Sequence, residues 1–133
     1  MYFQYKGLYL SDHDRSVIPE LRLILKQAHN LCQTVGAKFL FVFAPIKFRV
    51  YKDLTEFDTE SQARYWVAND LPQKLRVMFL EDFADEEFLD LTPAFVEQAK
   101  QKLFLYFDYD THWSPEGHRV VASAIANVLK KLE

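Results

Sequence analysis

The sequence of 133 residues has too few cysteines for a fold held by disulfide bonds. Cys32 is its only cysteine, so no intrachain disulfide and no cysteine-rich metal site can form. Cys32 lies on an apolar helical stripe, which predicts a buried and unreactive thiol. A disulfide scaffold is therefore excluded, and no cofactor is expected.

Long hydrophobic runs are absent as well. The longest extends from Phe39 to Pro45, which is far too short to cross a bilayer. The N-terminus lacks the charged start and the apolar core of a signal peptide. We therefore expect a soluble chain without membrane insertion, cytoplasmic as it stands and extracytoplasmic if it belongs to a longer parent.

The chain also carries no excess of positive charge. Its formal net charge is -3, and its lysines and arginines are scattered without a basic run. Proteins that bind nucleic acid neutralise phosphates with a basic surface. The composition thus argues against nucleic acid as a partner.

Apolar and aromatic side chains are what the sequence has in quantity. Half of its residues are hydrophobic and 16% are aromatic. Such a chain can bury enough apolar surface to offset its ordering entropy, so a disordered protein is excluded. We expect residues 1–133 to form one domain around one hydrophobic core.

Helical and extended patterns alternate along the chain. Apolar periodicity and capping residues predict helices over residues 15–35, 70–83, 92–101 and from 115 onward, with a further helical segment near 61–67. Short apolar runs predict extended segments over 38–45, 86–91 and 104–107, the first as a strand of a parallel sheet covered on both faces. The alternation indicates a layered α/β fold, although a sheet usually has about five strands.

The most informative segment runs from Asp110 to His118. It places a carboxylate two residues before the imidazole of His112, and a helix capped by Ser114 follows at once. A neutral histidine acts as a general base when one ring nitrogen faces the reactant and an acceptor holds the other. Asp110 can be that acceptor, as the aspartate is in a Ser-His-Asp triad.

Two other interpretations of this segment stay open. In the first, Asp110 and Ser114 are only turn and cap residues, and His112 and Trp113 are packing residues at a helix entrance. In the second, Asp108, Asp110 and His112 share one face of an extended segment and bind a metal ion. Three ligands from one strand seldom surround an ion well, so no metal site is expected.

The segment from Tyr106 to His118, running into an Ala/Val-rich helix, resembles the last conserved block of the SGNH (GDSL-like) hydrolase superfamily. Its Asp-Thr-His-Trp form is similar to that of alginate O-acetyltransferase-like proteins. The resemblance implies a flavodoxin-like three-layer sandwich with a parallel sheet. It also implies ester hydrolysis or acyl transfer, with Asp110 orienting His112 and His112 acting as the base.

The residues that this chemistry needs besides the pair are missing. The nucleophile of the superfamily lies in a Gly-Asp-Ser block, and a glycine and an asparagine from two further blocks form its oxyanion hole. None of the three glycines, Gly7, Gly36 and Gly117, precedes Asp-Ser. The nearest candidate is Ser11, but the order there is Ser-Asp, and a turn and helix cap explain it more simply.

We therefore interpret the chain as the C-terminal portion of an SGNH-like ester hydrolase or O-acyltransferase that acts on an ester or an acylated carbohydrate. Its serine would lie outside the chain, and the isolated chain would be nearly inactive. One alternative is a non-catalytic α/β domain used for binding or assembly, and another is a self-contained hydrolase with Ser11 as nucleophile. Missing strands also predict an open sheet edge, which a homodimer would cover through the aromatic segment from Tyr2 to Tyr9.

Overall fold

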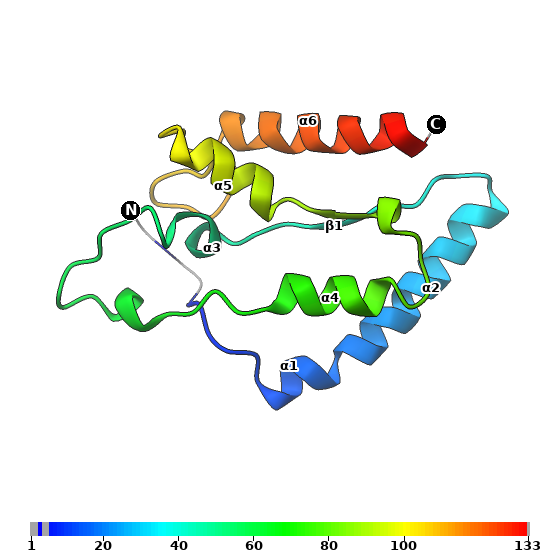
Figure 1. The fold of residues 1–133 in the computed structure, drawn as a ribbon, viewed down its shortest axis with the longest axis horizontal. Helices are drawn as coiled ribbons and strands as arrows, with labels where there is room; N and C mark the ends of the chain where they lie inside the picture. The colour runs from blue at the N-terminus through cyan, green and yellow to red at the C-terminus, as the bar shows by residue number, and fades with distance from the viewer. Residues whose placement is uncertain (1–2, 4–5, 133) are drawn as a thin grey trace.

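Two parallel strands lie between two layers of helices (Figure 1). The computed structural model describes residue 3 and residues 6–132. The strands β1 (Phe41–Phe43) and β2 (Phe88–Asp90) pair in parallel, with Phe41 opposite Phe88. Parallel strands need a crossover connection, and the helices between them provide it. The prediction of a parallel sheet is confirmed, and its two strands lie within the first two predicted extended segments.

Alternate strand side chains contact different helical layers, because successive residues of a strand point to opposite faces. The phenylalanines of both strands pack into one cluster with α2 (Ile18–Thr34) and α4 (Leu71–Phe79). Phe79 lies at its centre, fully buried. The buried members of this cluster are Leu25, Leu75, Met78, Phe79 and Phe88.

The second cluster lies on the opposite face of the strands. It receives Val42 and Leu89 from the sheet. Its helices are α3 (Lys47–Tyr51), α5 (Thr92–Lys100) and α6 (Pro115–Leu132). Its buried members are Val50, Tyr51, Leu91, Phe95, Ala99, Leu105 and Tyr106.

Several helix ends follow from local sequence. Ser11 forms a capping box with Asp14 at the start of α1 (Asp12–Ser16), as its predicted role of helix cap requires. Proline occupies the first turn of α2, α4 and α5, where its missing N–H has no helical partner to lose. Gly36 follows α2 with a φ of 68°, the left-handed conformation in which glycine has no steric cost.

Some boundaries differ from the predictions. The helix predicted over 15–35 consists of α1 and α2 with Val17 between them, and α4 ends at Phe79 rather than Phe83. Asp70 makes no side-chain cap, since its carboxylate lies 3.2 Å from Lys74 and forms an ion pair instead. Two short 3-10 helices, η1 (Gln62–Tyr65) and η2 (Asp85–Glu87), complete the elements.

The predicted apolar stripe of α2 is only partly buried. Leu25 is buried, but Ile24, Leu31 and Val35 are 60%, 66% and 72% exposed. Cys32, expected to be buried, is partly exposed. A two-stranded sheet is too narrow to cover a helix of 17 residues. The molecule thus presents an uncovered apolar helix face.

The predicted third extended segment is not part of the sheet. In the described residues the sheet has only two strands, and Tyr106 makes an isolated antiparallel bridge with Trp113. The fold is mixed α/β and is consistent with an incomplete flavodoxin-like sandwich. No helix in the described part of the chain is both long and apolar enough to span a membrane.

The predicted dimer segment from Tyr2 to Tyr9 lies partly outside the described residues. Within it, the ring of Phe3 packs at 5.6 Å from Phe48 and 5.9 Å from Phe57, measured between ring centroids. Phe3 is thus occupied within its own chain. Dimerisation stays a prediction.

We expect Asp82→Asn to weaken the attachment of α2 to the chain after α4. Hydrogen bonds from Arg22 and Lys26, the latter at 2.9 Å, hold the pKa of Asp82 well below its ordinary value of 3.8. Because the pKa of Asp82 is depressed in the folded state, the stabilisation is complete above the unfolded-state pKa near 3.8. It is lost as the pH falls from there toward the folded-state pKa. The variant should melt a few degrees lower at pH 7 and lose stability less steeply below about pH 4.

Thermal melts followed by circular dichroism between pH 7 and pH 3 measure this effect. Asp53→Asn is the control, because Asp53 is 80% exposed and, among the residues that the structure describes, pairs with the neighbouring Lys52. Equal melting profiles for Asp82→Asn and Asp53→Asn would contradict the assignment.

Candidate functional site

A hairpin-like turn carries the Asp110–His112 pair. Phe107 donates its N–H to the carbonyl of His112 at 3.1 Å, and Ser114 donates its N–H to the carbonyl of Leu105 at 3.0 Å. These bonds turn residues 105–107 back against residues 112–114. The segment therefore pairs with its own continuation rather than with β1 or β2, which is why the predicted third strand is absent.

Asp110 and His112 contact each other directly. Asp110 Oδ1 accepts a hydrogen bond from the backbone N–H of His112 at 2.8 Å and a short one from the ring at Nδ1. A carboxylate can only accept, so the proton of a neutral ring lies on Nδ1 and the lone pair on Nε2. The backbone and ring donors of His112 lower the pKa of Asp110. The pair has the geometry of a base and its orienting group.

The imidazole is open to solvent. The side chain of His112 is 83% exposed and that of Asp110 is 48% exposed. His112 is thus not the packing residue that one of the alternative interpretations requires. Trp113 does pack, with its ring 5.8 Å from Phe95 and 5.5 Å from His118 between centroids.

Ser114 closes the turn and starts α6, as predicted. Its hydroxyl donates to the carbonyl of Phe104 at 2.6 Å and accepts from the N–H of Gly117 at 3.2 Å. Gly117 also allows close packing, because a Cβ there would lie 2.2 Å from the carbonyl oxygen of Leu105. Cap and glycine together lock the turn onto the first turn of α6.

A second set of contacts ties the turn to the carboxyl end of β1. The hydroxyl of Tyr106 donates to the carbonyl of Pro45 at 2.6 Å. The ammonium of Lys47 donates to the carbonyls of Phe107 and Asp108 at 2.7 and 2.9 Å. Burial raises the pKa of Tyr106 and lowers the pKa of Lys47. The turn that carries Asp110 and His112 is thus held between the end of β1 and the start of α6.

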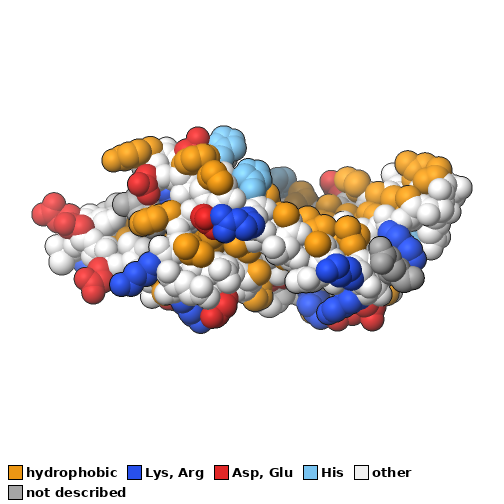
Figure 2. All heavy atoms as spheres, turned by 90° about the horizontal axis from the view of Figure 1, so that it is seen from above, with side chains coloured by type: hydrophobic (Ala, Val, Ile, Leu, Met, Phe, Trp, Pro, Cys, Tyr) orange, Lys and Arg blue, Asp and Glu red, His pale blue; other side chains and the backbone are white. Residues whose placement is uncertain are grey.

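A hollow of about 350 Å³ opens beside the imidazole. His118 of α6 lies in it as a second histidine, and Ile46 adds an apolar wall. Figure 2 shows histidine side chains at the surface beside hydrophobic ones. The residues that line the hollow are Ala44, Pro45, Ile46, Lys47, Tyr106, Thr111, His112, Trp113 and His118.

Sequence reasoning did not consider Lys47 as a site residue and gave His118, at the end of the motif, no role. Lys47 follows an apolar strand and is the first residue of a five-residue helix, too short to show periodicity. His118 lies one turn into α6, at the end of the motif. Neither residue carries a local signal for its position in the hollow.

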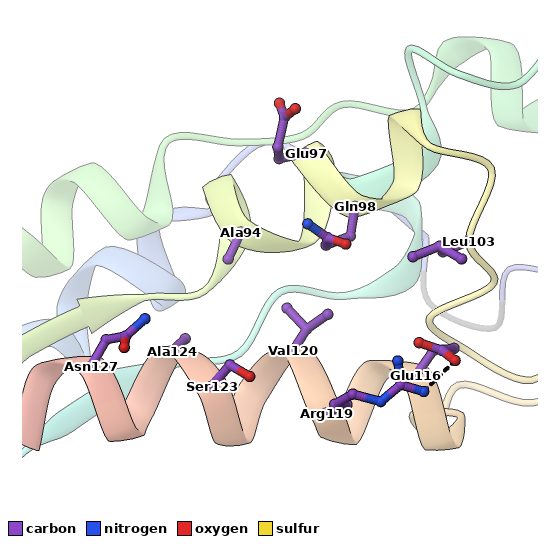
Figure 3. A pocket seen from close by; sticks show the side chains of 10 residues that line it. All are labelled: Ala94, Glu97, Gln98, Leu103, Glu116, Arg119, Val120, Ser123, Ala124 and Asn127. Atoms are coloured by element: carbon purple, nitrogen blue, oxygen red, sulfur yellow. Dashed lines mark hydrogen bonds and ion pairs between the residues drawn. The ribbon is translucent and has the colours of Figure 1, made fainter.

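A larger groove of about 410 Å³ runs between α5 and α6 (Figure 3). Ala94, Val120 and Ala124 point into it, and an ion pair between Glu116 and Arg119 lies at one end. It contains no histidine. The groove therefore offers no pair of the kind that Asp110 and His112 form.

No metal cluster supports the third interpretation of the motif. Within residues 3 and 6–132, no group of three or more histidine, cysteine, aspartate or glutamate side chains could hold an ion. Asp108, Asp110 and His112 thus do not converge as ligands. The carboxylate of Asp110 is occupied by His112 instead.

None of the serine hydroxyls among the described residues is shown bonded to His112. Ser11 donates to Asp14 at 2.7 Å, and α1 lies on the far side of the α2–α4 layer from the turn before α6 (Figure 1). Ser16 and Ser114 donate to backbone carbonyls, and Ser61 accepts from the N–H of Ala63. Ser123 lies in the α5–α6 groove. The geometry does not support Ser11 as the nucleophile.

Comparison with protein families gives a match over nearly the whole chain. Residues 2–133 match the family described as the SGNH hydrolase-like domain, acetyltransferase AlgX. Neither the search of curated proteins nor the search of solved structures finds a match. The match agrees with the Asp-Thr-His-Trp resemblance and with the α/β architecture. The chain belongs to the SGNH hydrolase-like domain family of the acetyltransferase AlgX.

Proposed function

We propose that this chain supplies the orienting aspartate and the general base of an SGNH-type O-acyltransferase or esterase. Asp110 orients His112, and the serine comes from a segment outside residues 1–133. The observation that carries the proposal is the pair of hydrogen bonds that Asp110 Oδ1 accepts from His112, one from the backbone N–H and one from the ring at Nδ1. They orient the ring so that Nε2 can take a proton. The substrate is an ester or an acylated carbohydrate.

In this mechanism Nε2 of His112 takes the proton of the serine hydroxyl while the serine oxygen attacks the ester carbonyl. The bond to the leaving alcohol breaks, and Nε2 returns the proton to the alcohol oxygen. Water or a sugar hydroxyl then attacks the acyl-serine, giving its proton to Nε2, which returns it to the serine oxygen. Asp110 stays ionised and stabilises the imidazolium in each step.

Two exposed surfaces favour the proposal that a further segment packs on this chain in the active protein. His112 is 83% exposed, whereas a base acts best in a site from which water is excluded. The exposed apolar face of α2, with Leu23, Ile24 and Leu31 each at least 60% exposed, has no cover within the described chain. A serine-bearing segment that completes the sheet would address both.

The second candidate is a non-catalytic binding or assembly domain. The same apolar face of α2 favours it, because large uncovered patches mark interaction surfaces. It predicts that no serine is activated by His112. Both candidates are therefore separated by one labelling experiment.

The test is fluorophosphonate labelling of the natural protein or complex that contains this sequence, with the labelled residue identified by mass spectrometry. We expect one labelled serine outside residues 1–133. His112→Ala should slow labelling by about 10³-fold or more, because the serine loses its base. His13→Ala is the control, since His13 is an exposed residue of α1.

Three results would contradict the proposal. One is labelling of Ser11 or of another serine of this chain. The second is labelling that His112→Ala leaves unchanged. The third is the absence of any labelled serine, which would favour the assembly domain.

A further inference from the structure

Lys47 is a charged residue in a place that ordinarily excludes charge. It is only 2% exposed and begins α3 just after the carboxyl end of β1. Burial lowers its pKa, against the opposing effect of Asp108 and Asp110. Burying an ammonium group costs several kcal/mol unless hydrogen bonds compensate it. An apolar side chain would fill the same space without that cost.

Backbone carbonyls provide the compensation. The ammonium has three N–H donors, and it donates to the carbonyls of Phe107 at 2.7 Å and Asp108 at 2.9 Å, with the carbonyl of Asp110 at 3.5 Å. No ion pair to Lys47 occurs among the described residues. The contacts join positions about 60 residues apart in sequence. The charged group thus binds the backbone of a single turn.

That turn is the one that carries the Asp110–His112 pair. The carbonyl bonds fix the backbone over residues 107–110, from which the carboxylate of Asp110 projects toward Nδ1 of His112. The side of the turn near Tyr106 is already tied to Pro45. Within the turn the N–H of Asp110 donates to the carbonyl of Phe107 at 3.4 Å, and Lys47 ties these residues to the start of α3.

We propose that Lys47 is a positioning residue, whose ammonium group holds the backbone carbonyls of Phe107 and Asp108 so that the carboxylate of Asp110 meets Nδ1 of His112. Its use in catalysis rests on the proposed function. The effect on the pair does not, and it can be measured without any substrate.

The first measurement uses the unmodified chain. In ¹⁵N NMR of lysine ammonium groups, we expect the Lys47 protons to exchange with water about tenfold or more slowly than those of Lys52. We also expect couplings across the hydrogen bonds to the carbonyl carbons of Phe107 and Asp108. Exchange as fast as that of Lys52, with no such coupling, would overturn the proposal.

The second measurement compares three variants. Lys47→Met removes the donors and keeps an unbranched side chain only one heavy atom shorter. Lys52→Met is the matched control, because Lys52 pairs with the exposed Asp53. The ¹⁵N shifts of the His112 ring should show loss of the Nδ1–H tautomer preference in Lys47→Met, and no change in Lys52→Met. The pKa of Asp110 should rise toward its ordinary value in Lys47→Met and not in Lys52→Met.

Lys47→Arg separates position from charge. Its planar guanidinium keeps the positive charge but cannot match carbonyls arranged around a compact ammonium. We expect it to lose the tautomer preference as Lys47→Met does. If Lys47→Arg keeps the Nδ1–H tautomer preference of His112 in full, the positive charge alone explains the effect of Lys47 on the ring, and the positioning role is overturned.

These outcomes are independent of the labelling experiment. If Lys47→Met does not fold, the exchange measurement on the unmodified chain still tests the hydrogen bonds, and Lys47→Arg tests their effect on the His112 ring. If the labelling finds no activated serine but Lys47→Met changes the His112 ring, the proposed function fails and the positioning role stands. If His112→Ala slows labelling as expected and Lys47→Met leaves the His112 ring unchanged, the proposed function stands and the positioning role of Lys47 fails.

Discussion

Phe95→Ala is expected to lower the free energy of unfolding by about 3–5 kcal/mol, the range for truncating a buried phenylalanine. Phe95 of α5 is fully buried. Its ring centroid lies 5.6 Å from that of Tyr106 and 5.8 Å from that of Trp113. Removing it opens a cavity beneath both sides of the turn that carries Asp110 and His112.

Urea unfolding measures this loss. Phe104→Ala is the matched control, because Phe104 is 63% exposed and should cost no more than about 0.5 kcal/mol. Since the cavity lies under Trp113, the tryptophan signals in the NMR spectrum should also change in Phe95→Ala. A loss for Phe95→Ala no larger than for Phe104→Ala would contradict the packing described above.

Gly117→Ala is expected to destabilise the chain by about 1–3 kcal/mol or more, as overpacking does. In an open helix interior the same change would stabilise, by about 0.8–1.0 kcal/mol of helix propensity. Here the added Cβ would lie 2.2 Å from the carbonyl oxygen of Leu105 and 3.0 Å from Cβ of Trp113. The first is a backbone atom and cannot rotate away, so the clash outweighs the propensity.

Gly36→Ala is the comparison for this variant. Its Cβ would meet nothing within 4 Å, so only the φ of 68° opposes the substitution. That conformation costs roughly 1–2 kcal/mol for a residue with a Cβ. Gly36→Ala should therefore leave the His112 ring signals unchanged, whereas Gly117→Ala should shift them by pushing the turn away from α6. Unchanged ring signals in both variants would contradict the close packing of α6 on the turn.

Local features of the fold could be predicted from sequence because their partners are near in the chain. The capping box of Ser11 and Asp14 spans three residues, and the cap of Ser114 on α6 does the same. Helix α5 was predicted almost to its last residue, since Thr92 and Pro93 mark its start. The strands were predicted in place but too long, because an apolar run shows only which residues can be buried.

Contacts between distant segments could not be predicted. The run 104–107 has the composition of a strand, but the turn after it brings the chain back and Trp113 becomes its partner. Helix α3 lacks any periodic signal in its five residues. The apolar stripe of α2 predicted burial, yet burial also needs a surface to pack on, and two strands do not supply enough of it.

The candidate site divides in the same way. By itself the sequence determined that Asp110 can reach His112, because only one residue separates them, while two other interpretations of the segment stayed open. Only the tertiary structure decided what holds that pair: a lysine about 60 residues earlier, buried under the turn. The physical reason is that a separation of two residues permits this hydrogen bond but does not by itself fix the backbone of the turn. A buried ammonium becomes favourable only after packing has assembled the carbonyls that receive it.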